Sequence, residues 1–279
     1  MKRSVVITGV SSGIGLDAAT LLVERGFRVF GSVRKESDGQ AVKRQLGDSF
    51  VPLIFDVTDQ AKIAVAVEQV RDELGDGGMT ALVNNSGIAP AGPLMHFPPE
   101  ELRKLFEVNV VGLLAVTQAF LPLLGARRNC PHPPGRVINM SSVSGGLVFP
   151  FVGAYSASKY AVEALSDGLR LELGFYGIDV IAIEPGTIRT PIWDKFEAAS
   201  ASGPYAETDY RSSLDAFRAM ATEAARKGAP PSIVSQAILK AIEAKKPKAR
   251  YPLSGQWRLG KIMPTGLMDR MLIKTVKLS

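Results

Sequence analysis

Short apolar runs alternate with longer amphipathic stretches along most of this 279-residue chain. Most of the runs are apolar at consecutive positions, as expected of strands that are buried on both faces of a parallel sheet. They lie at residues 4–8, 27–33, 51–55, 80–83, 136–140 and 178–183, and the amphipathic stretches lie near residues 14–25, 59–74, 100–125 and 156–175. This alternation predicts an α/β fold in one domain, a doubly wound parallel sheet of about seven strands with helices on both faces.

The pattern changes after residue 190. Residues 191–230 are mostly small and polar, with a composition that favours helix. This is typical of an insertion that covers a site as a lid or binding loop. The alternative is that the insertion only decorates the surface. A further helix near 231–244 and a short strand near 250–253 complete the predicted sheet. We assign residues 1–255 to one domain and residues 256–279 to a C-terminal extension.

Composition and charge indicate a globular protein and argue against nucleic-acid binding. Hydrophobic residues make up 46% of the chain and charged residues 22%, which is ordinary for a globular protein. The formal net charge is +6, but residues 241–279 hold 9 Lys/Arg and 2 Asp/Glu, while residues 1–240 hold 24 and 25. The body is therefore near neutral, and no module for nucleic-acid binding accompanies the basic tail.

Several other sites and segments are excluded. The one cysteine, Cys130, excludes an intrachain disulfide, and His96 and His132 lack metal-ligand spacing. The N-terminal apolar run is too short for a signal peptide, so we expect a cytoplasmic protein. Residues 108–126 are uncharged over 19 positions, yet they include polar residues and a proline, which favours a buried or interface helix over a membrane span.

A glycine-rich stretch, Thr8 to Gly15, follows the first predicted strand and opens the first predicted helix. Helix N-termini present free N–H groups, and glycines there let a pyrophosphate approach the backbone. This placement predicts a dinucleotide site in a Rossmann-type fold rather than a bare strand–helix turn. The glycine spacing is x3 then x1, which differs from the usual G-x-G-x-x-G.

Motifs further along the chain accompany this opening and occur after successive predicted strands. They are Asn84-Asn85-Ser86-Gly87, Asn109, Ser141-Ser142, Tyr155-x3-Lys159, and Pro185-Gly186 followed by Ile188 and Thr190. In order and spacing this set, over residues 4–190, resembles the short-chain dehydrogenase/reductase family. Within the family, the chain looks most like hydroxysteroid and retinol dehydrogenases.

The resemblance implies an oxidoreductase that moves a hydride between a nicotinamide and a carbonyl or alcohol. It implies a catalytic set of Asn109, Ser142, Tyr155 and Lys159. The cofactor-binding residues that it implies are Gly9, Ser11, Ser12, Gly13, Ile14, Gly15, Arg34, Asp56, Val57, Asn85, Ser86, Gly87, Tyr155, Lys159, Pro185, Gly186, Ile188 and Thr190.

The second predicted strand indicates which nicotinamide is used. An acidic residue at its end favours NAD, but Val33 stands there and Arg34-Lys35 follow. A guanidinium meets a 2′-phosphate with a planar pair of donors, so we expect NADP(H), with Arg34 as the discriminator. The alternative is that both cations are solvated surface charges.

Tyr155 and Lys159 are four residues apart in a predicted helix and therefore share one face. An unperturbed tyrosine has a pKa near 10, and a neighbouring cation is expected to lower it. Tyr155 is thus the candidate acid/base. The resemblance implies that Ser142 polarises the substrate carbonyl and that Asn109 holds a water in a proton relay behind Lys159.

Mainly apolar segments follow the fourth and fifth predicted strands and precede the insertion. The candidate pocket residues are Pro93, Val143, Phe149 and Trp193, with Glu197, Arg211 and Arg218 as possible additions from the insertion. A pocket of this kind predicts a lipophilic small-molecule substrate. The resemblance implies that the uncharged helix and the Tyr155 helix form the interface of a homodimer or homotetramer.

Two other functions stay open at this point. One is an NADPH-binding redox sensor, although such a protein does not need all four catalytic residues. The other is a dehydratase or epimerase of the same family, although the chain is short for those enzymes.

Residues 266–279 place Leu267, Met271 and Val276 near one helical face among cations. Such an end either packs near the substrate entrance or a partner subunit, or lies on an anionic membrane surface.

Overall fold

Seven parallel strands form one sheet in the computed structural model, which describes residues 3–75, 77–191, 205, 207–255, 263–276 and 278. The strand order is β3-β2-β1-β4-β5-β6-β7, which confirms the doubly wound sheet expected from the sequence. The strands are β1 (Ser4–Ile7), β2 (Arg28–Val33), β3 (Phe50–Ile54), β4 (Ala81–Asn84), β5 (Arg136–Met140), β6 (Asp179–Glu184) and β7 (Arg250–Pro252).

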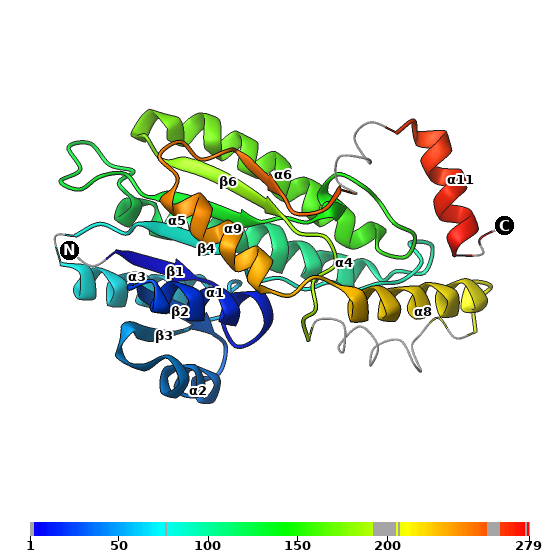
Figure 1. Cartoon of the computed structure of the whole chain (residues 1–279), viewed down its shortest axis with the longest axis horizontal. Coiled ribbons are helices and arrows are strands. Elements are labelled where there is room, and N and C mark those ends of the chain that lie inside the picture. The colour runs from blue at the N-terminus through cyan, green and yellow to red at the C-terminus, as the bar shows by residue number, and fades with distance from the viewer. Residues whose placement is uncertain are drawn as a thin grey trace.

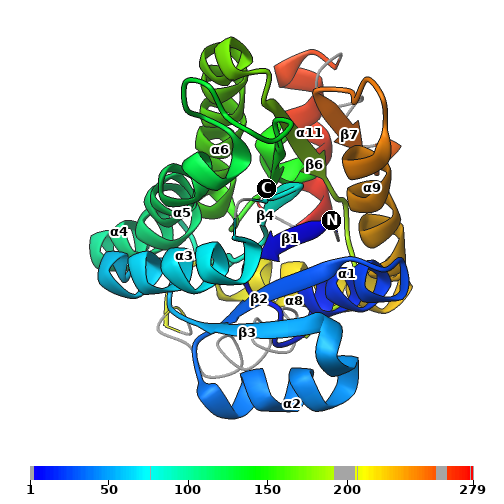
Figure 2. The ribbon, with the colours of Figure 1, turned by 90° about the vertical axis from the view of Figure 1, so that its left-hand side faces the viewer.

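Helices cover both faces of this sheet (Figure 2). On one face pack α1 (Gly13–Glu24), α2 (Glu36–Leu46) and α9 (Ser232–Glu243); on the other pack α3 (Gln60–Leu74), α5 (Gly112–Phe120) and α6 (Gly153–Leu173). Val5 and Ile7 of β1 join the core beneath the first group, and Val6 between them joins the core beneath the second. The alternation of side chains along a strand thus builds two apolar cores from one fully buried strand.

Helix α2 is the one element of the sheet layers that the apolar pattern did not predict. It buries only Gly39 and Val42 and is otherwise polar, so it gives little periodic signal.

The uncharged stretch at residues 108–126 lies mostly in a long composite helix. This helix runs from α4 (Pro99–Phe106) through a π-helical turn (Glu107–Val111) into α5 and a 3-10 turn (Leu121–Leu124). Among the described residues, only this helix is long and apolar enough to cross a membrane by length and composition, and 44% of its most apolar window is buried. Val116 and Phe120 pack into the core beneath α5, as expected of a core helix.

The chain reverses its winding direction between β1 and β4. β1 pairs with β2 on one side and with β4 on the other, so the loops that leave these neighbouring strands diverge. A crevice at the carboxyl ends of the strands is the usual ligand site of such a sheet. The glycine-rich loop and Asn85 both leave strands at this point.

Two helices lie beyond the carboxyl ends of the strands, α8 (Arg211–Lys227) and α11 (Thr265–Thr275) (Figure 1). Leu214 and Phe217 of α8 form a small apolar cluster with Phe151, which precedes α6, and with Val276 after α11. The insertion predicted at residues 191–230 therefore contributes a helix at the ligand edge of the sheet. The packing of Val276 favours the interpretation of the C-terminal segment as a helix docked near that edge.

Arg136 of β5 ties the sheet to the end of α9. Its guanidinium donates hydrogen bonds to the carbonyls of Ala241 at 2.6 Å, Ile242 at 2.7 Å and Ala244 at 2.6 Å. The last carbonyls of a helix have no partner within the helix and carry a partial negative charge.

We expect Arg136→Met to lower the free energy of unfolding by about 2–3 kcal/mol, because charge-assisted hydrogen bonds to helix carbonyls are lost in a partly buried position. Urea unfolding measures the change. Arg44→Met, at an exposed arginine of α2, serves as the control and should change it by less than about 0.5 kcal/mol. Equal effects of the two substitutions would contradict the anchoring role of Arg136.

Candidate active site

A cleft of about 460 Å³ opens at the carboxyl edge of the sheet, above the switch point. Its walls come from the loops after β1, β2, β3 and β4, from the segment after β6 and from α8. The described lining residues that the sequence predicted for the cofactor are Gly9, Ser11, Ser12, Gly13, Ile14, Arg34, Asp56, Val57, Asn85, Ser86, Gly87 and Thr190.

The glycine-rich loop closes the cleft beside α1 and needs its glycines for two reasons. Gly9 has φ +73°, a conformation that favours glycine, and a Cβ there would lie 2.8 Å from Ser86 Oγ. A Cβ on Gly15 would lie 2.2 Å from the Gly9 carbonyl oxygen. The loop therefore packs tightly against the start of α1 and the end of β4.

The N-terminus of α1 is open to a ligand. Ser12 is its N-cap residue, in extended conformation, and no described side chain caps the helix or adds an acidic group to its first turn. Since Ser12 and Gly13 line the cleft, the free N–H groups and the positive end of the helix dipole face it. The site is suited to an anionic group such as a phosphate.

Hydrogen bonds fix the two loops that flank this point. Thr8 Oγ1 accepts the backbone N–H groups of Asn85 and Ser86, both at 2.9 Å. The Asn85 side-chain amide donates to the carbonyls of Thr8 at 2.9 Å and Gly9 at 3.0 Å. The asparagine of the predicted motif thus holds the glycine-rich loop in place.

At the end of β2 the cleft is lined by Val33 and the exposed Arg34, whereas the neighbouring Lys35 does not line it. Asp56 lines the cleft after β3, and one of its carboxylate oxygens accepts the backbone N–H of Thr58 at 3.0 Å. A guanidinium therefore lines the cleft directly after β2, as the NADP(H) expectation requires.

The predicted catalytic residues meet at the end of β5. Ser142 follows this strand as the N-cap of a 3-10 turn (Val143–Gly145) and accepts the Ser144 N–H at 3.1 Å. It also hydrogen-bonds to the Tyr155 side chain, which lies in the first turn of α6. A serine on one element and a tyrosine on another are thus brought together by tertiary packing.

Burial raises the pKa of the Tyr155 phenol above its usual value, and the hydrogen bond with Ser142 offsets part of this rise. The direction is opposite to the lowering that a nearby cation was expected to cause. The reason is that desolvation of the buried phenolate outweighs the other contributions. Tyr155 is therefore held as the neutral phenol, which is the form that donates a proton.

Lys159 lies one turn further along α6 and is buried, whereas Tyr155 is half-buried. Its Nζ donates to the Met140 carbonyl at 2.7 Å and lies 5.7 Å from the centre of the Tyr155 ring. Burial lowers the pKa of Lys159 to about 8, and the nearby Glu163 carboxylate opposes that change. The lysine therefore changes charge close to physiological pH.

Asn109 stands in the π-helical turn, where its side chain holds the loop after β4. Its Oδ1 accepts the Ile88 N–H at 2.9 Å, and its Nδ2 donates to the Ile88 carbonyl at 2.9 Å and to Ser158 Oγ at 3.1 Å. Ser158 in turn donates to the Tyr155 carbonyl at 2.7 Å. Asn109 thereby links the cleft wall to the helix that carries Tyr155 and Lys159.

Several predicted residues are not among those that line this cleft. All four predicted catalytic residues are in this group, Asn109, Ser142, Tyr155 and Lys159, and Gly15 packs within the loop. Pro185, Gly186 and Ile188 do not line it either: the Pro185 carbonyl accepts the Val143 N–H at 2.8 Å, and Ile188 bridges to Ala229.

The residues predicted for the substrate pocket agree less well with the lining of the cleft than those predicted for the cofactor. Pro93 and Val143 are buried and, like Phe149, do not line the cleft, while Trp193 and Glu197 lie outside the described residues. The cleft instead meets α8, through Leu214, Phe217 and Arg218, and is also lined by Tyr205. Only Arg218 among these was a sequence candidate, because no pattern shows where a helix after the last long loop will pack.

Other lining residues were within reach of the sequence but were not named. Ser32, Phe55, Ile88, Ala89, Pro90 and Ala91 lie at or just after the ends of β2, β3 and β4. Extending each predicted strand end by a few residues would have found them, since strand ends at one edge line the ligand crevice.

Comparison with known proteins identifies this arrangement. A family model described as short chain dehydrogenase matches residues 3–201. The chain belongs to the short-chain dehydrogenase family. It is therefore an oxidoreductase that acts on CH–OH or C=O groups.

Individual relatives agree along nearly the whole chain. The chain is 40% identical over 279 residues to an NADPH-dependent 3-dehydrocapnine reductase of Ornithobacterium rhinotracheale, covering 99% of this chain and 98% of that protein. It is 33% identical over 290 residues to human retinol dehydrogenase 16, with 97% and 87% covered. A solved short-chain dehydrogenase of Streptomyces avermitilis has a TM-score of 0.77 at 30% identity, covering 99% of this chain and 96% of that one. The likeness to retinol dehydrogenases is thereby confirmed.

The lowered pKa of Lys159 predicts a stability difference that depends on pH. Below about pH 8 the folded protein holds a charge that burial disfavours, and this penalty disappears as pH rises from about 8 to 10.5. We expect Lys159→Met, without added cofactor, to raise the free energy of unfolding at pH 7 by about 3 kcal/mol. The gain should shrink over that window.

Urea unfolding from pH 6 to 10.5 measures the effect, with Lys246→Met, at an exposed lysine, as the control. A difference between wild type and Lys159→Met that does not change with pH would show that Lys159 is not buried in its charged form.

Proposed function

We propose that this protein is an NADP(H)-dependent oxidoreductase that reduces the carbonyl of a lipophilic substrate, or oxidises the matching alcohol, with Tyr155 as general acid/base. One observation carries the proposal: the Tyr155 phenol is hydrogen-bonded to Ser142 and lies beside the buried Lys159, at the edge of the sheet where the cleft opens. The name of the Ornithobacterium relative, an NADPH-dependent reductase, supports the same reaction class.

The residues around the cleft fit a phosphorylated dinucleotide. The loop from Gly9 to Gly15 and the uncapped N-terminus of α1 would hold the pyrophosphate, since a Cβ on Gly15 would displace the backbone. Arg34, Ser11 and Ser12 would meet the 2′-phosphate. Asp56 and Val57 would lie against the adenine ring.

When bound, the cofactor supplies or accepts the hydride at the substrate carbon. The chain manages the proton. Ser142 orients the carbonyl oxygen by a hydrogen bond, and the neutral Tyr155 phenol donates its proton to that oxygen as it becomes negative. The Lys159 ammonium stabilises the phenolate that remains, and Asn109 fixes the helix that carries both groups.

The cleft wall under α8 supports a lipophilic substrate. Leu214, Phe217 and Tyr205 lie there, together with Ala91 and Pro90 from the loop after β4. Apolar walls of this kind bind apolar ligand surface. The charge of Arg218 is met by Asp215 at 3.0 Å on the same helix.

The alternative of a redox sensor with little turnover has less support. A binding protein requires the glycine-rich loop and Arg34 but no buried Tyr–Lys pair, and buried ionisable groups destabilise a fold.

We also propose that the protein is a homo-oligomer. Apolar side chains on the outer surface of the α4–α6 layer are exposed, among them Val111 at 44%, Leu171 at 74% and Phe175 at 80%. An exposed apolar face of this kind is typical of an interface between protein chains.

Tyr155→Phe should reduce turnover by at least about a thousandfold, because it removes the proton donor and leaves the ring in place. NADPH consumption against a panel of ketones and aldehydes, graded from short polar to long apolar, is the measurement. NADPH binding, followed by quenching of protein fluorescence, should be unchanged in the same variant.

Two outcomes would contradict the proposal. Turnover of Tyr155→Phe within tenfold of wild type would remove Tyr155 from the chemistry. NADPH binding without turnover of any compound in the panel would favour the redox sensor.

Arg34→Asp should reverse the cofactor preference. It removes the donor that meets the 2′-phosphate and introduces a carboxylate that accepts hydrogen bonds from the ribose hydroxyls of NADH. We expect kcat/KM for NADPH to fall roughly 100-fold relative to that for NADH, since charge-assisted hydrogen bonds are worth about 1.5–3 kcal/mol. Lys35→Asp is the control, because Lys35 does not line the cleft; an equal effect there would assign the preference to general charge.

A further inference from the structure

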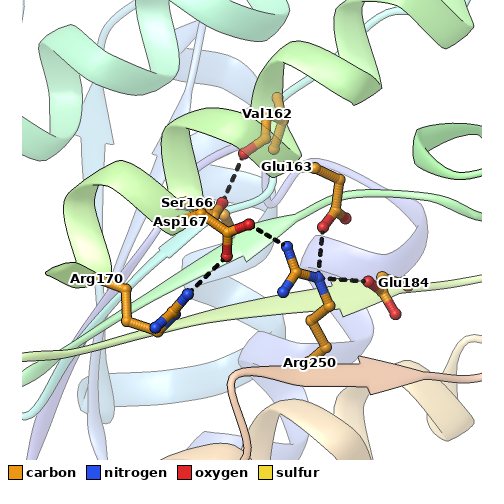
Figure 3. Close-up of polar contacts among 8 residues, drawn as sticks. Val162, Glu163, Ser166, Asp167, Arg170, Glu184 and Arg250 are labelled. Carbon is orange, nitrogen blue, oxygen red and sulfur yellow. Dashed lines mark hydrogen bonds and ion pairs between the residues drawn. The ribbon is translucent and has the colours of Figure 1, made fainter.

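A cluster of charged side chains joins α6, β6 and β7 (Figure 3). Arg250 of β7 is at its centre and contacts carboxylates from two other elements. Its Nε lies 2.9 Å from Glu163 Oε2 and 3.4 Å from Glu184 Oε1, and its other guanidinium edge lies 2.7 Å from Asp167 Oδ2. Asp167 also accepts a hydrogen bond from Arg170 at 2.9 Å.

Glu163 is the member of this cluster nearest to Lys159 along α6. The two residues are four apart and therefore lie on the same face of the helix, where Cβ atoms are about 5–6 Å apart. Both are buried, at 9% and 6% exposure. Glu163 Oε2 is held by Arg250, whereas Oε1 is buried and has no hydrogen-bond partner among the described residues.

The Glu163 carboxylate is incompletely paired among the described residues, because Arg250 meets only its Oε2. Asp167 and Arg170 pair with each other at the half-exposed end of the cluster. An unbalanced buried charge is strongly disfavoured, and a cation one helical turn away offsets it. The Lys159 ammonium is that cation.

Among the described residues, few other ionisable groups come from the elements packed around Lys159. Tyr155 is next to it on α6, and Glu184 and Arg250 come from β6 and β7. The 3-10 turn after β5 contributes only Val143, Ser144 and Gly145, and the loop after β4 approaches with Gly87. Glu107 of the π-helical turn and the four charged side chains of α4 are exposed to solvent.

We infer that Glu163, held in place by Arg250, is a positioning residue that keeps Lys159 in its charged form during carbonyl reduction. The inference rests on the proposed role of Lys159 and extends it to a second layer of residues. Glu163 acts through Lys159 and has no contact with the cleft.

The pH profile of carbonyl reduction tests this. In wild type, kcat/KM for the carbonyl substrate at saturating NADPH should fall as pH rises through about 8, where Lys159 loses its proton. Glu163→Gln keeps the shape and an oxygen for Arg250 but removes the negative charge. Its falling limb should lie about one pH unit lower, because an opposite charge within about 4–6 Å shifts a pKa by this much or more. At pH 9, which is above the midpoints of both falling limbs, kcat/KM of Glu163→Gln should therefore be roughly tenfold lower than that of wild type.

Two matched variants separate charge from packing. Asp167→Asn also weakens a hydrogen bond to Arg250 but acts two turns from Lys159, so its limb should stay at the wild-type pH. Arg250→Gln removes the cation that faces Glu163, so its limb should move to higher pH. A merely structural cluster would give the same direction of change in all three variants.

A measurement without turnover keeps the test independent of the proposed function. The difference in unfolding free energy between each protein and its Lys159→Met counterpart, followed against pH, reports the titration of Lys159 directly. The window in which it changes should begin about one unit lower in Glu163→Gln than in wild type.

The outcomes are distinct. If no carbonyl is reduced but the stability window moves as expected, the proposed function fails and the effect of Glu163 on Lys159 stands. If carbonyls are reduced and the limb and window of Glu163→Gln stay at the wild-type pH, or Asp167→Asn moves them equally, the inference is overturned.

Discussion

Four hydrogen bonds between the ends of β1 and β4 determine the geometry of the site. Thr8 accepts two backbone N–H groups from the loop after β4, and the Asn85 amide returns two bonds to the loop after β1. Neighbouring parallel strands whose connections run in opposite directions would otherwise leave their loops free to separate. Because these loops are tied together, the glycine-rich turn, the open end of α1 and the loop that Asn109 grips become one rigid wall.

The second constraint is electrostatic. Tyr155 is half-buried and Lys159 is buried, and desolvation moves their pKa values apart, upward for the phenol and downward for the ammonium. Both shifts favour the neutral forms, so the pair is unfavourable for folding and useful for proton transfer. The Glu163 carboxylate, held by Arg250, opposes the second shift. The residues behind the helix are therefore as relevant to its chemistry as those that line the cleft.

Local patterns in the sequence were sufficient for the sheet, because most positions of its buried strands are apolar. The loops that follow these strands lie at one edge, and the family motifs named Gly9, Asn85 and Thr190 among them. Helix α2 was missed because it buries only two residues. Leu214 and Phe217 were missed because α8 reaches the cleft by packing on Phe151, a contact with no local signature. The rise in the pKa of Tyr155 depends on how many atoms exclude water from it, which no spacing of motifs encodes.

The two sides of the cleft are formed by parts of the chain that are synthesised at different times. The residues that line the cofactor side lie between the end of β1 and Pro191, whereas α8 and Val276, which belong to the apolar cluster with Phe151, come later in the chain. During synthesis on the ribosome, the dinucleotide side can therefore assemble before the wall against which the substrate rests. A cofactor bound at that stage would stabilise the growing chain by mass action. The apolar cluster around Phe151 can form only after α8 and α11 have been synthesised.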